Sequence, residues 1–388
     1  MNVLIEFFDE EPIENLITCT HFEMDKVICF GYRPMMSLEA RGKLKRSHKM
    51  LCGEHEMEFV EVPYGELNDI VKSMDEVLAR EYDAGNQCFF DLTGGGDLIL
   101  VAMGILSAKY PTPMHTFNVR TGQLSVIEQP DIQSIEVLAK RHEKQLTLDH
   151  VIGFYGGRID YSSQKDYKSH LDDPDFEETV MAMWKVAERN KKKWNGFSAF
   201  LRSCTDFQLT DLMVDASTED VNRMIKKAPG IYSMKDVNQY LQMLGNCGIL
   251  QNVTANREGI SFEYKDFTIK DCLHDAGCVL ELYTYYEFKN SGRYSDVRVG
   301  AHIAWEDDTW YDDDNVKNEI DVLALEGNVP VFVSCKNGKV DQMALYELET
   351  VAKRFGGHRA RKVLMAGQKL SAGYAKRAEE MGITVRQA

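Results

Sequence analysis

The sequence predicts an α/β protein in three parts, and three changes of pattern lead to this division. Short β-rich runs alternate with longer helical runs at the N-terminus, which is typical of a doubly wound, mainly parallel sheet. From about residue 155 the pattern becomes helical with polar connections, which indicates a helical or winged-helix-like middle segment. Paired strands and helices return in the last third and predict a C-terminal α/β domain. We place the three parts at 1–150, 151–265 and 266–388.

The first part contains five strand-like runs and four helical ones. The expected strands are at 3–8, 26–31, 58–62, 87–92 and 114–118. The expected helices are at 12–20, 36–51, 64–81 and 97–108. Open sheets of this type bind ligands in the crevice beyond the carboxyl ends of their strands. The loops after the strands are therefore the places to search for a binding site.

The middle part is helical and ends in two short β runs. A helix over 234–244 precedes strand-like runs at 249–252 and 259–264, an order that suggests a winged-helix-like module. The alternative is a linker domain that only spaces and dimerises its neighbours. Lys191, Lys192 and Lys193, followed by Trp194, could grip single-stranded nucleic acid or could form the wet face of a helix.

The last part combines strands with two amphipathic helices. We expect helices at 277–288, 341–355 and 372–381, and strands at 319–325, 331–335, 362–365 and 383–386. Leu345, Leu348, Ala352 and Phe355 recur at helical spacing, so their helix packs one face on the sheet. An acidic run at 306–314 lacks the central glycine and closing glutamate of a calcium loop, and we interpret it as a solvated insert.

Composition narrows the class of protein. The chain has 388 residues, 44% of them apolar and 27% charged, which suits two or three globular domains. Its 9 cysteines form no CxxC pair, which favours reduced thiols in a cytosol over disulfides or a structural zinc. No apolar run approaches the ~20 residues that span a bilayer, so we expect a cytoplasmic protein without membrane contact. The net charge of -16 argues against non-specific coating of nucleic acid, but a nuclease needs only a local basic strip and a metal.

A glycine-rich loop joins an expected buried strand to an apolar helix. Thr93, Gly94, Gly95, Gly96 and Asp97 occupy the junction. Glycines let a backbone approach a ligand closely, and the start of a helix offers free N–H groups to polar or anionic atoms. The loop has neither the Lys-Ser or Lys-Thr of a Walker loop nor the spacing of a dinucleotide fingerprint. A tight structural turn and a ligand site both fit it.

A second polar loop follows the first expected strand, with Asp9 and Glu10 in the loop and Asn15 on the helix after it. With both loops at carboxyl ends of parallel strands, residues 1–150 resemble the CRISPR-associated Rossmann-like sensor (CARF) domains. This resemblance implies a cyclic oligoadenylate as ligand and a homodimer that binds it across a two-fold axis. It gives these ligand candidates: Asp9, Glu10, Asn15, Thr93, Gly94, Gly95, Gly96 and Asp97. Carboxylates repel phosphates, so Asp9 and Glu10 would accept hydrogen bonds from adenine amines or ribose hydroxyls, or face water.

Acids and a lysine fall on one face of an expected strand pair. Side chains repeat every second residue in a strand, so Glu319 shares a face with Asp321, and Ser334 shares one with Lys336. If the two strands form a hairpin, the acids and the lysine converge. Carboxylates can hold Mg²⁺ or Mn²⁺ for phosphodiester hydrolysis, and a lysine can stabilise the developing charge. The alternative is a solvated strand whose charges form salt bridges.

The arrangement resembles the restriction-endonuclease-like superfamily, with its acid followed by a PD-(D/E)xK strand. On this resemblance, Asp321 matches the first acid and Lys336 the lysine, while Ser334 stands where an acid is usual. Glu319 is then the substitute ligand, the carbonyl of Cys335 could also ligate, and Glu281 on the preceding helix would complete the site. The catalytic candidates are Lys336, Asp321, Glu319 and Glu281, and the metal candidates are Asp321, Glu319, Glu281 and Cys335.

Taken together, the two ends of the chain resemble CRISPR ancillary effector nucleases that fuse a sensor to a restriction-like domain. The resemblance implies metal-dependent cleavage of single-stranded RNA and DNA, with nicking of duplex DNA, when cyclic tetra-adenylate is bound. Two other readings stay open. One is a ligand-responsive transcription regulator whose middle segment binds DNA and whose nuclease-like domain is inactive. The other is a metabolic enzyme that uses an unrelated nucleotide, although the glycine loop has no catalytic base beside it.

Overall fold

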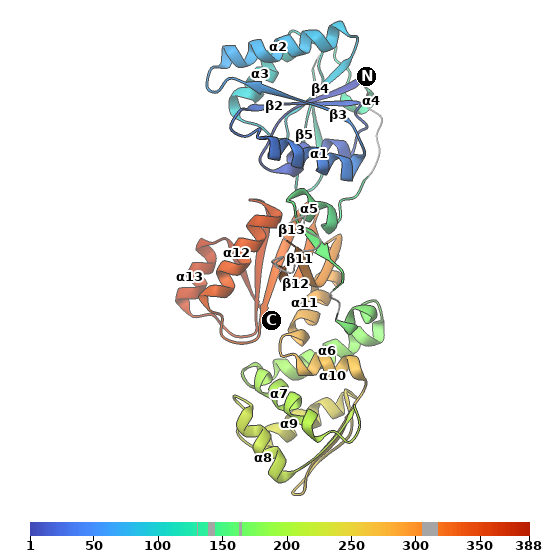
Figure 1. The fold of residues 1–388 in the computed structure, drawn as a ribbon, viewed down its shortest axis with the longest axis vertical. Coiled ribbons are helices and arrows are strands. Elements are labelled where there is room, and N and C mark those ends of the chain that lie inside the picture. The colour runs from blue at the N-terminus through green and yellow to red at the C-terminus, as the bar shows by residue number, and fades with distance from the viewer. Residues whose placement is uncertain (130, 139–143, 163–164, 305–316) are drawn as a thin grey trace.

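The computed structural model describes residues 1–129, 131–138, 144–162, 165–304 and 317–388. The acidic run at 306–314 lies outside these residues. Figure 1 shows three parts following one another along the long axis, with the C-terminal domain between the other two. None of the described helices combines the length and the apolar character needed to cross a bilayer.

The N-terminal part is built on a sheet of strand order β3-β2-β1-β4-β5-β6, in which the first five strands are parallel. Its strands are β1 (Asn2–Phe7), β2 (Lys26–Tyr32), β3 (Glu56–Val62), β4 (Gln87–Asp91), β5 (Met114–Asn118) and β6 (Gln123–Ile127). Helix α1 (Leu38–Cys52) shares a core with one face, and α2 (Leu67–Asp83) and α3 (Asp97–Ser107) with the other. The strand order reverses between β1 and β4, which creates a crevice beyond these two strands.

The expected helix at 12–20 is wrong. The segment forms two 3₁₀ turns, η1 (Pro12–Asn15) and η2 (Thr18–Thr20), and is buried throughout. Asn15 Nδ2 donates to Phe7 O at 2.5 Å, and the Thr18 hydroxyl donates to the buried Asp91 carboxylate. These side-chain bonds to neighbouring strands fix a tighter path than a continuous α-helix would allow.

The middle stretch leads from the N-terminal part into the other two parts. It begins with α4 (Ile135–Leu138), α5 (Leu148–Phe154) and the short strand β7 (Arg158–Asp160). A helical module follows, made of η3 (Asp166–His170), α6 (Pro174–Glu188), α7 (Lys191–Ser203), η4 (Cys204–Phe207), β8 (Met213–Ser217), α8 (Thr218–Lys227), α9 (Met234–Asn246), β9 (Leu250–Ala255), β10 (Gly259–Tyr264) and α10 (Phe267–His274). The expected hairpin of β9 and β10 is present, and β8 adds a third strand that the sequence pattern did not predict.

The C-terminal domain has a mixed sheet of order β15-β14-β13-β12-β11-β7. Its elements are α11 (Cys278–Asn290), β11 (Asp296–Ala304), β12 (Lys317–Glu326), β13 (Val329–Lys336), α12 (Gln342–Gly356), β14 (Arg361–Ala366), α13 (Ala372–Glu380) and β15 (Ile383–Gln387). Strand β11 was not predicted. Strand β7 pairs with β11 at the edge of this sheet although it lies far earlier in the sequence.

The C-terminal sheet shares a hydrophobic core with each of its neighbours. On one side, Val322 and Val333 belong to a cluster that includes the fully buried Trp194 of the middle module. On the other side, Leu323 and Phe332 belong to a cluster that includes Leu4 of the N-terminal sheet. Helix α5 contributes to this second cluster and packs between the two sheets. Both neighbours are therefore physically joined to the sheet that carries the expected catalytic residues.

Candidate active site

Strands β12 and β13 form the antiparallel hairpin that the sequence predicted. Val322 lies opposite Val333, and Leu323 opposite Phe332. This register sets Asp321 beside the end of β13. Its Oδ2 atom accepts a 2.6 Å hydrogen bond from the Cys335 N–H and a 3.3 Å bond from the Ser334 hydroxyl. The first expected acid is therefore held by the strand on which the expected lysine lies.

A cavity of about 220 Å³ opens beside this hairpin. Glu319, Asp321, Ser334 and Lys336 all line it, and α12 adds Glu347 on the other wall. Burial raises the pKa of Asp321, while the Cys335 N–H and the Lys336 charge act in the opposite direction. The structure thus brings two acids and the lysine to one cavity, as strand periodicity predicts.

Glu281 lies in the first turn of α11, close enough to interact with Asp321. Burial first, and then the charge of Asp321, raise the pKa of Glu281 to about 8. Its Oε2 atom is buried and has no hydrogen-bond partner among the described residues. A buried carboxyl group whose pKa is raised by a neighbouring acid can be satisfied by a proton or by a cation.

Glu319 lies at the rim of this cluster, with a side chain that is 42% exposed. It is 3.8 Å from Lys165 Nζ and 4.0 Å from Nε2 of His302, its neighbour on β11. Lys165 also pairs with Asp275 at 3.1 Å, so a second lysine reaches the acids from the connection before α6. Sequence reasoning missed Lys165 and His302, because neither lies in a strand or helix whose periodicity pointed to the site.

The donor set suits a hard divalent cation, but only in part. No group of three or more His, Cys, Asp or Glu side chains among the described residues is arranged to hold a metal. Glu281 and Asp321 supply carboxylate oxygens, the ligands that Mg²⁺ and Mn²⁺ prefer. The Glu281 Oε2 atom, which has no hydrogen-bond partner among the described residues, is the observation that fits a bound cation. The thiol of Cys335 is buried against the Thr284 hydroxyl at 3.6 Å, so only its backbone carbonyl is a candidate ligand.

Comparison with known proteins agrees with this geometry. Residues 273–386 match the Card1-like endonuclease domain family. Glu281, Glu319, Asp321 and Lys336 all lie within the matched residues, whereas Lys165 lies outside them. No curated protein sequence matches the chain.

Two solved structures share the fold of the whole chain. Protein VC1899 from Vibrio cholerae has 16% identity and a TM-score of 0.69, with 100% of this chain and 94% of that chain covered. Can2 from Sulfobacillus thermosulfidooxidans, in complex with cyclic tetra-adenylate, has 15% identity and a TM-score of 0.62, with 100% and 95% covered. These likenesses confirm the predicted fold class, and with the family match they confirm the resemblance to CRISPR-associated sensor nucleases.

The two expected sensor loops touch each other in the crevice beyond β1 and β4. Asp9 Oδ2 accepts a 3.3 Å hydrogen bond from the Gly95 N–H, and Asp9 Oδ1 accepts one of 2.9 Å from the Glu11 N–H. Asn15 is only 1% exposed, and its side chain bonds to Phe7 O and to the Asp9 N–H. Asn15 therefore stabilises the loop through buried hydrogen bonds. Glu10, in contrast, is exposed to solvent. Their contact with a ligand stays a prediction.

A buried aspartate shapes the glycine loop. Asp91 Oδ1 accepts hydrogen bonds from the N–H and the hydroxyl of Thr93. Burial raises the pKa of Asp91, but the nearby His115 and the hydrogen bonds outweigh burial and lower it, so Asp91 stays ionised. Sequence reasoning took Asp91 only as the end of a strand.

Backbone geometry explains why glycines occupy this loop. Gly95 has φ +117°, and a Cβ there would lie 3.0 Å from Phe7 Cβ, so only glycine fits without strain. A Cβ on Gly94 would lie 2.9 Å from Glu14 Oε2. Gly96 is different, because its φ is -78° and a Cβ would have ordinary contact with Tyr32 at 3.9 Å. Asp97, the first residue of α3, is exposed.

The loop after β1 also contacts the endonuclease domain. Glu11 Oε1 accepts a 2.7 Å hydrogen bond from the His358 N–H, and Glu11 Oε2 accepts one from the Tyr155 hydroxyl. Glu14 forms an ion pair with Arg359. His358 and Arg359 come directly after α12, the helix that lines the catalytic cavity. One sensor loop thus touches both the glycine loop and the domain with the candidate active site.

Proposed function

We propose that this chain is a metal-dependent endonuclease that is activated by a cyclic oligoadenylate and acts in type III CRISPR antiviral defence. Its substrates are single-stranded RNA or DNA, with nicking of duplex DNA as a further activity. The observation that carries the proposal is the group of Glu319, Asp321 and Lys336 at one cavity, with the buried Glu281 near Asp321, in a stretch that matches the Card1-like endonuclease domain family.

The chemistry follows from the charges at this cavity. Asp321 and Glu281 would hold Mg²⁺ or Mn²⁺, with Glu319 and the Cys335 carbonyl as further ligands. A cation bound there supplies charge that polarises the phosphate and makes water a better nucleophile. Lys336 lies beside Asp321 and stabilises the charge that develops on the phosphate oxygens. Lys165 offsets the charge of the acids at the rim, because it lies near Glu319.

The crevice beyond β1 and β4 is the proposed activator site. A shared fold with Can2, whose structure contains cyclic tetra-adenylate, supports this ligand class for the present chain. The glycine loop offers backbone N–H groups, and its partner loop offers the Asp9 carboxylate as an acceptor. We further propose that two copies of the chain form a homodimer around the cyclic ligand.

Activation needs a physical connection between the two sites, and the loop after β1 supplies one. Its Glu14 carboxylate lies against Gly94 on the ligand side and pairs with Arg359 on the nuclease side. A ligand that moves the loop would therefore move residues at the end of α12. Because α12 lines the catalytic cavity with Glu347, such movement changes the wall opposite Asp321.

Lys336→Ala tests the proposal directly. Cleavage of labelled single-stranded RNA and DNA is measured with Mn²⁺, with and without cyclic tetra-adenylate, and after chelation. The rate should fall about 100- to 1000-fold, the usual cost of removing a group that stabilises transition-state charge. Activator affinity should not change. Lys376→Ala is the matched control, because Lys376 is exposed on α13.

Full metal-dependent cleavage by a folded Lys336→Ala protein would contradict the nuclease proposal. Sequence-specific DNA binding by the wild-type chain, without cleavage under any of these conditions, would favour the transcription-regulator reading instead.

A further inference from the structure

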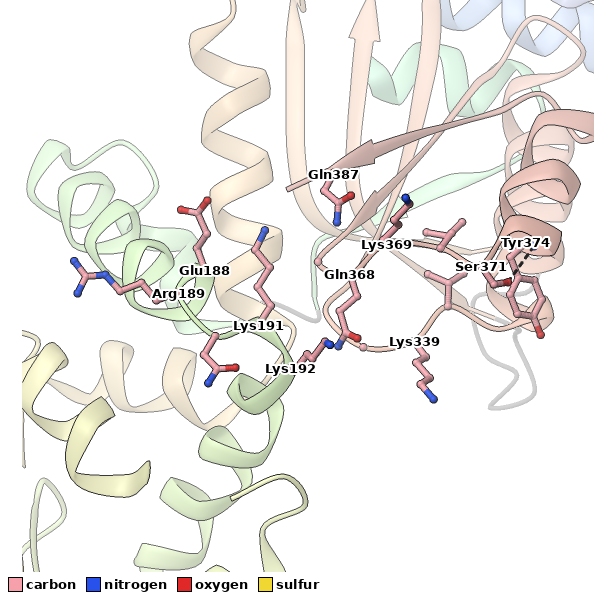
Figure 2. Close-up of a pocket in the computed structure, with 15 residues that line it drawn as sticks. Glu188, Arg189, Lys191, Lys192, Lys339, Gln368, Lys369, Ser371, Tyr374 and Gln387 are labelled. Carbon is pink, nitrogen blue, oxygen red and sulfur yellow. Dashed lines mark hydrogen bonds between the residues drawn. The ribbon is translucent and has the colours of Figure 1, made fainter. Parts of the chain in front are cut away.

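A basic groove of about 860 Å³ separates the middle module from the endonuclease domain. Figure 2 shows Lys191 and Lys192 of α7 on one wall, and Lys339 and Lys369 on the loops across from them. Those loops follow β13 and β14. Arg189 lies at the outer edge of the groove, and Glu188 is the only acid among the described residues that line it. Positive charge is thus concentrated here in a chain whose net charge is -16.

Among the described residues, three of the four lysines that line the groove lack the kind of partner that Lys191 and the neighbouring Lys193 have. Lys193 forms a 2.6 Å ion pair with Asp236, and Lys191 Nζ bonds the Ala388 carbonyl oxygen. Lys192, Lys339 and Lys369 are exposed and form no ion pair with any residue that the structure describes. Like charges that face one groove without partners repel each other and attract an anion.

The groove begins where the candidate catalytic strand ends. Lys336 O accepts a 2.8 Å hydrogen bond from the Gly367 N–H, so the two loops are joined at the catalytic lysine itself. Gln368 Nε2 then donates to Asn337 O at 3.2 Å, and Asn337 Nδ2 donates to Ala276 O at 2.5 Å. The loops that carry Lys339 and Lys369 are therefore anchored next to Lys336, which lines the cavity of Asp321.

The remaining lining residues suit a polynucleotide strand better than a simple anion. Gln368, Gln387, Asn190 and Ser371 offer neutral donors and acceptors, and Tyr374 offers an aromatic ring. Grooves that bind single strands combine cations along the backbone path with polar and aromatic side chains for sugars and bases. A volume of about 860 Å³ is within the ~300–1,000 Å³ typical of ligand pockets, which is room for a few nucleotides and too little for a duplex.

We propose that this groove binds the single-stranded nucleic acid on one side of the bond to be cut, with Lys192, Lys339 and Lys369 contacting its phosphates. The inference rests on the proposed nuclease function and adds the path of the substrate strand. It also gives the middle module a role, because α7 forms one wall of the groove.

Strand binding by the full-length chain tests the groove separately from cleavage. In a Lys336→Ala background, which prevents cutting, the triple change Lys192→Ala, Lys339→Ala and Lys369→Ala is compared with its parent by fluorescence anisotropy. The probe is a labelled single-stranded oligonucleotide, with cyclic tetra-adenylate and Mg²⁺ present. The Kd should rise at least tenfold at low salt. The slope of log K against log salt should shrink by about 2, since each lost single-strand phosphate contact contributes roughly 0.7.

A matched control removes three exposed lysines far from the groove: Lys45, Lys72 and Lys226. This triple variant should bind like the parent. An unchanged Kd and salt slope in the groove variant would overturn the inference, as would an equal loss in the control variant. Equally tight duplex binding through the same three lysines would also overturn it. Cleavage by the wild-type chain reports separately on the proposed function, which stands if the groove variant binds normally and the wild type cuts.

Discussion

The crevice of the sensor sheet and the cavity of the endonuclease sheet satisfy their polar groups in opposite ways. In the crevice, Asp9 and Thr93 bond to loop backbone or to a buried acid, so the site is held by its own hydrogen bonds. Beside the cavity, Glu281 and Asp321 repel each other, and one Glu281 oxygen has no partner among the described residues. The proposed activator crevice is therefore shaped without a ligand, whereas the candidate active site depends on a proton or a cation.

The largest effect expected from this difference is in metal binding at Glu281. A metal must displace the proton of a carboxyl group whose pKa is about 8, so affinity should rise as pH rises. The Mn²⁺ concentration for half-maximal cleavage should fall about tenfold per pH unit between pH 6 and 8. Glu281→Gln should raise that concentration by about 10- to 100-fold at pH 8 and remove its dependence on pH. Cleavage titrations at several pH values provide the measurement.

The same carboxyl group predicts how stability depends on pH without metal. Its folded pKa of about 8 is above the ordinary 4.5, so between these values the folded chain binds more protons than the unfolded one. The free energy of unfolding contributed by this group is therefore highest below pH 4.5 and is lost as pH rises to 8. Glu281→Gln should flatten this part of the melting profile. If the Tm of the wild type rises between pH 4.5 and pH 8, and the Tm of Glu281→Gln rises by the same amount, the raised pKa is contradicted.

The sensor side of the comparison is tested by Gly96→Ala. Gly96 has ordinary backbone angles and space for a methyl group, so this change alters the surface of the loop without straining it. If the ligand approaches the loop backbone closely, activator affinity should fall about tenfold with little change in Tm. Gly104→Ala on α3, where a Cβ meets nothing within 4 Å, is the control. Calorimetry with cyclic tetra-adenylate measures both variants, and equal affinities would exclude the loop from the site.

Gly95→Val serves a different purpose from Gly96→Ala. With φ +117° and Phe7 at 3.0 Å, a branched side chain at Gly95 strains the loop itself. Both affinity and Tm should fall, which separates the cost of distorting the loop from the cost of blocking the ligand. A loss of affinity in Gly95→Val alone would show that the loop shapes the crevice without touching the ligand.

The contact between the two regions should have a smaller effect than either site. Arg359→Ala removes the ion pair with Glu14, whose pKa is raised by burial and by Asp9 and is lowered by Arg359. The ratio of cleavage rates with and without cyclic tetra-adenylate should fall about three- to tenfold, within the usual range of coupling between sites. Arg377→Ala is the control, because Arg377 contacts Tyr346 and Glu380 within the endonuclease domain. The same ratio in Arg359→Ala and the wild type would make the ion pair purely structural.

The sequence predicts those features of the two regions that arise from residue patterns within a single strand or helix, and it misses those that arise from tertiary contacts. The alternation along β12 and β13 is a local period, and it was enough to bring Asp321 and Lys336 together. Strand and helix alternation likewise placed the two loops of the crevice. The path of 12–20 failed, because hydrogen bonds from Asn15 and Thr18 to other strands override local propensity. Lys165 left no local signal, because it reaches the acids only through tertiary packing.

Strand β7 and the pair of Glu14 with Arg359 show the same limit over longer distances. β7 has three residues and gains its place from an edge of a sheet formed by the C-terminal strands. From the sequence, Glu14 is only an acidic residue near a loop. Its role becomes visible in the fold, where it pairs with Arg359 after α12. Such contacts form only when two parts of the chain pack against each other. The residue pattern within one part does not predict how that packing occurs.

The smallest and most specific prediction concerns Glu319, at the rim of the cavity. Its side chain is 42% exposed and lies 3.8 Å from Lys165 Nζ, so solvent and this lysine already stabilise its charge. We therefore expect Glu319→Gln to raise the half-maximal Mn²⁺ concentration only about two- to fivefold, far less than Glu281→Gln. An unaltered metal requirement would make Glu319 surface charge and leave the site to Asp321, Glu281 and the Cys335 carbonyl.

Ser334→Asp makes that test decisive, because the serine hydroxyl lies 3.3 Å from Asp321 Oδ2. A carboxylate there would add like charge beside a buried acid, which costs stability without metal and strengthens the cavity as a cation site. The change should lower the Mn²⁺ requirement of the wild type and restore most of what Glu319→Gln loses. Rescue of Glu319→Gln but not of Glu281→Gln would mean that Glu319 substitutes for the acid missing at Ser334. If Ser334→Asp rescues neither Glu319→Gln nor Glu281→Gln, the site works with the neutral Ser334 hydroxyl. Glu281 would then be its most important carboxylate.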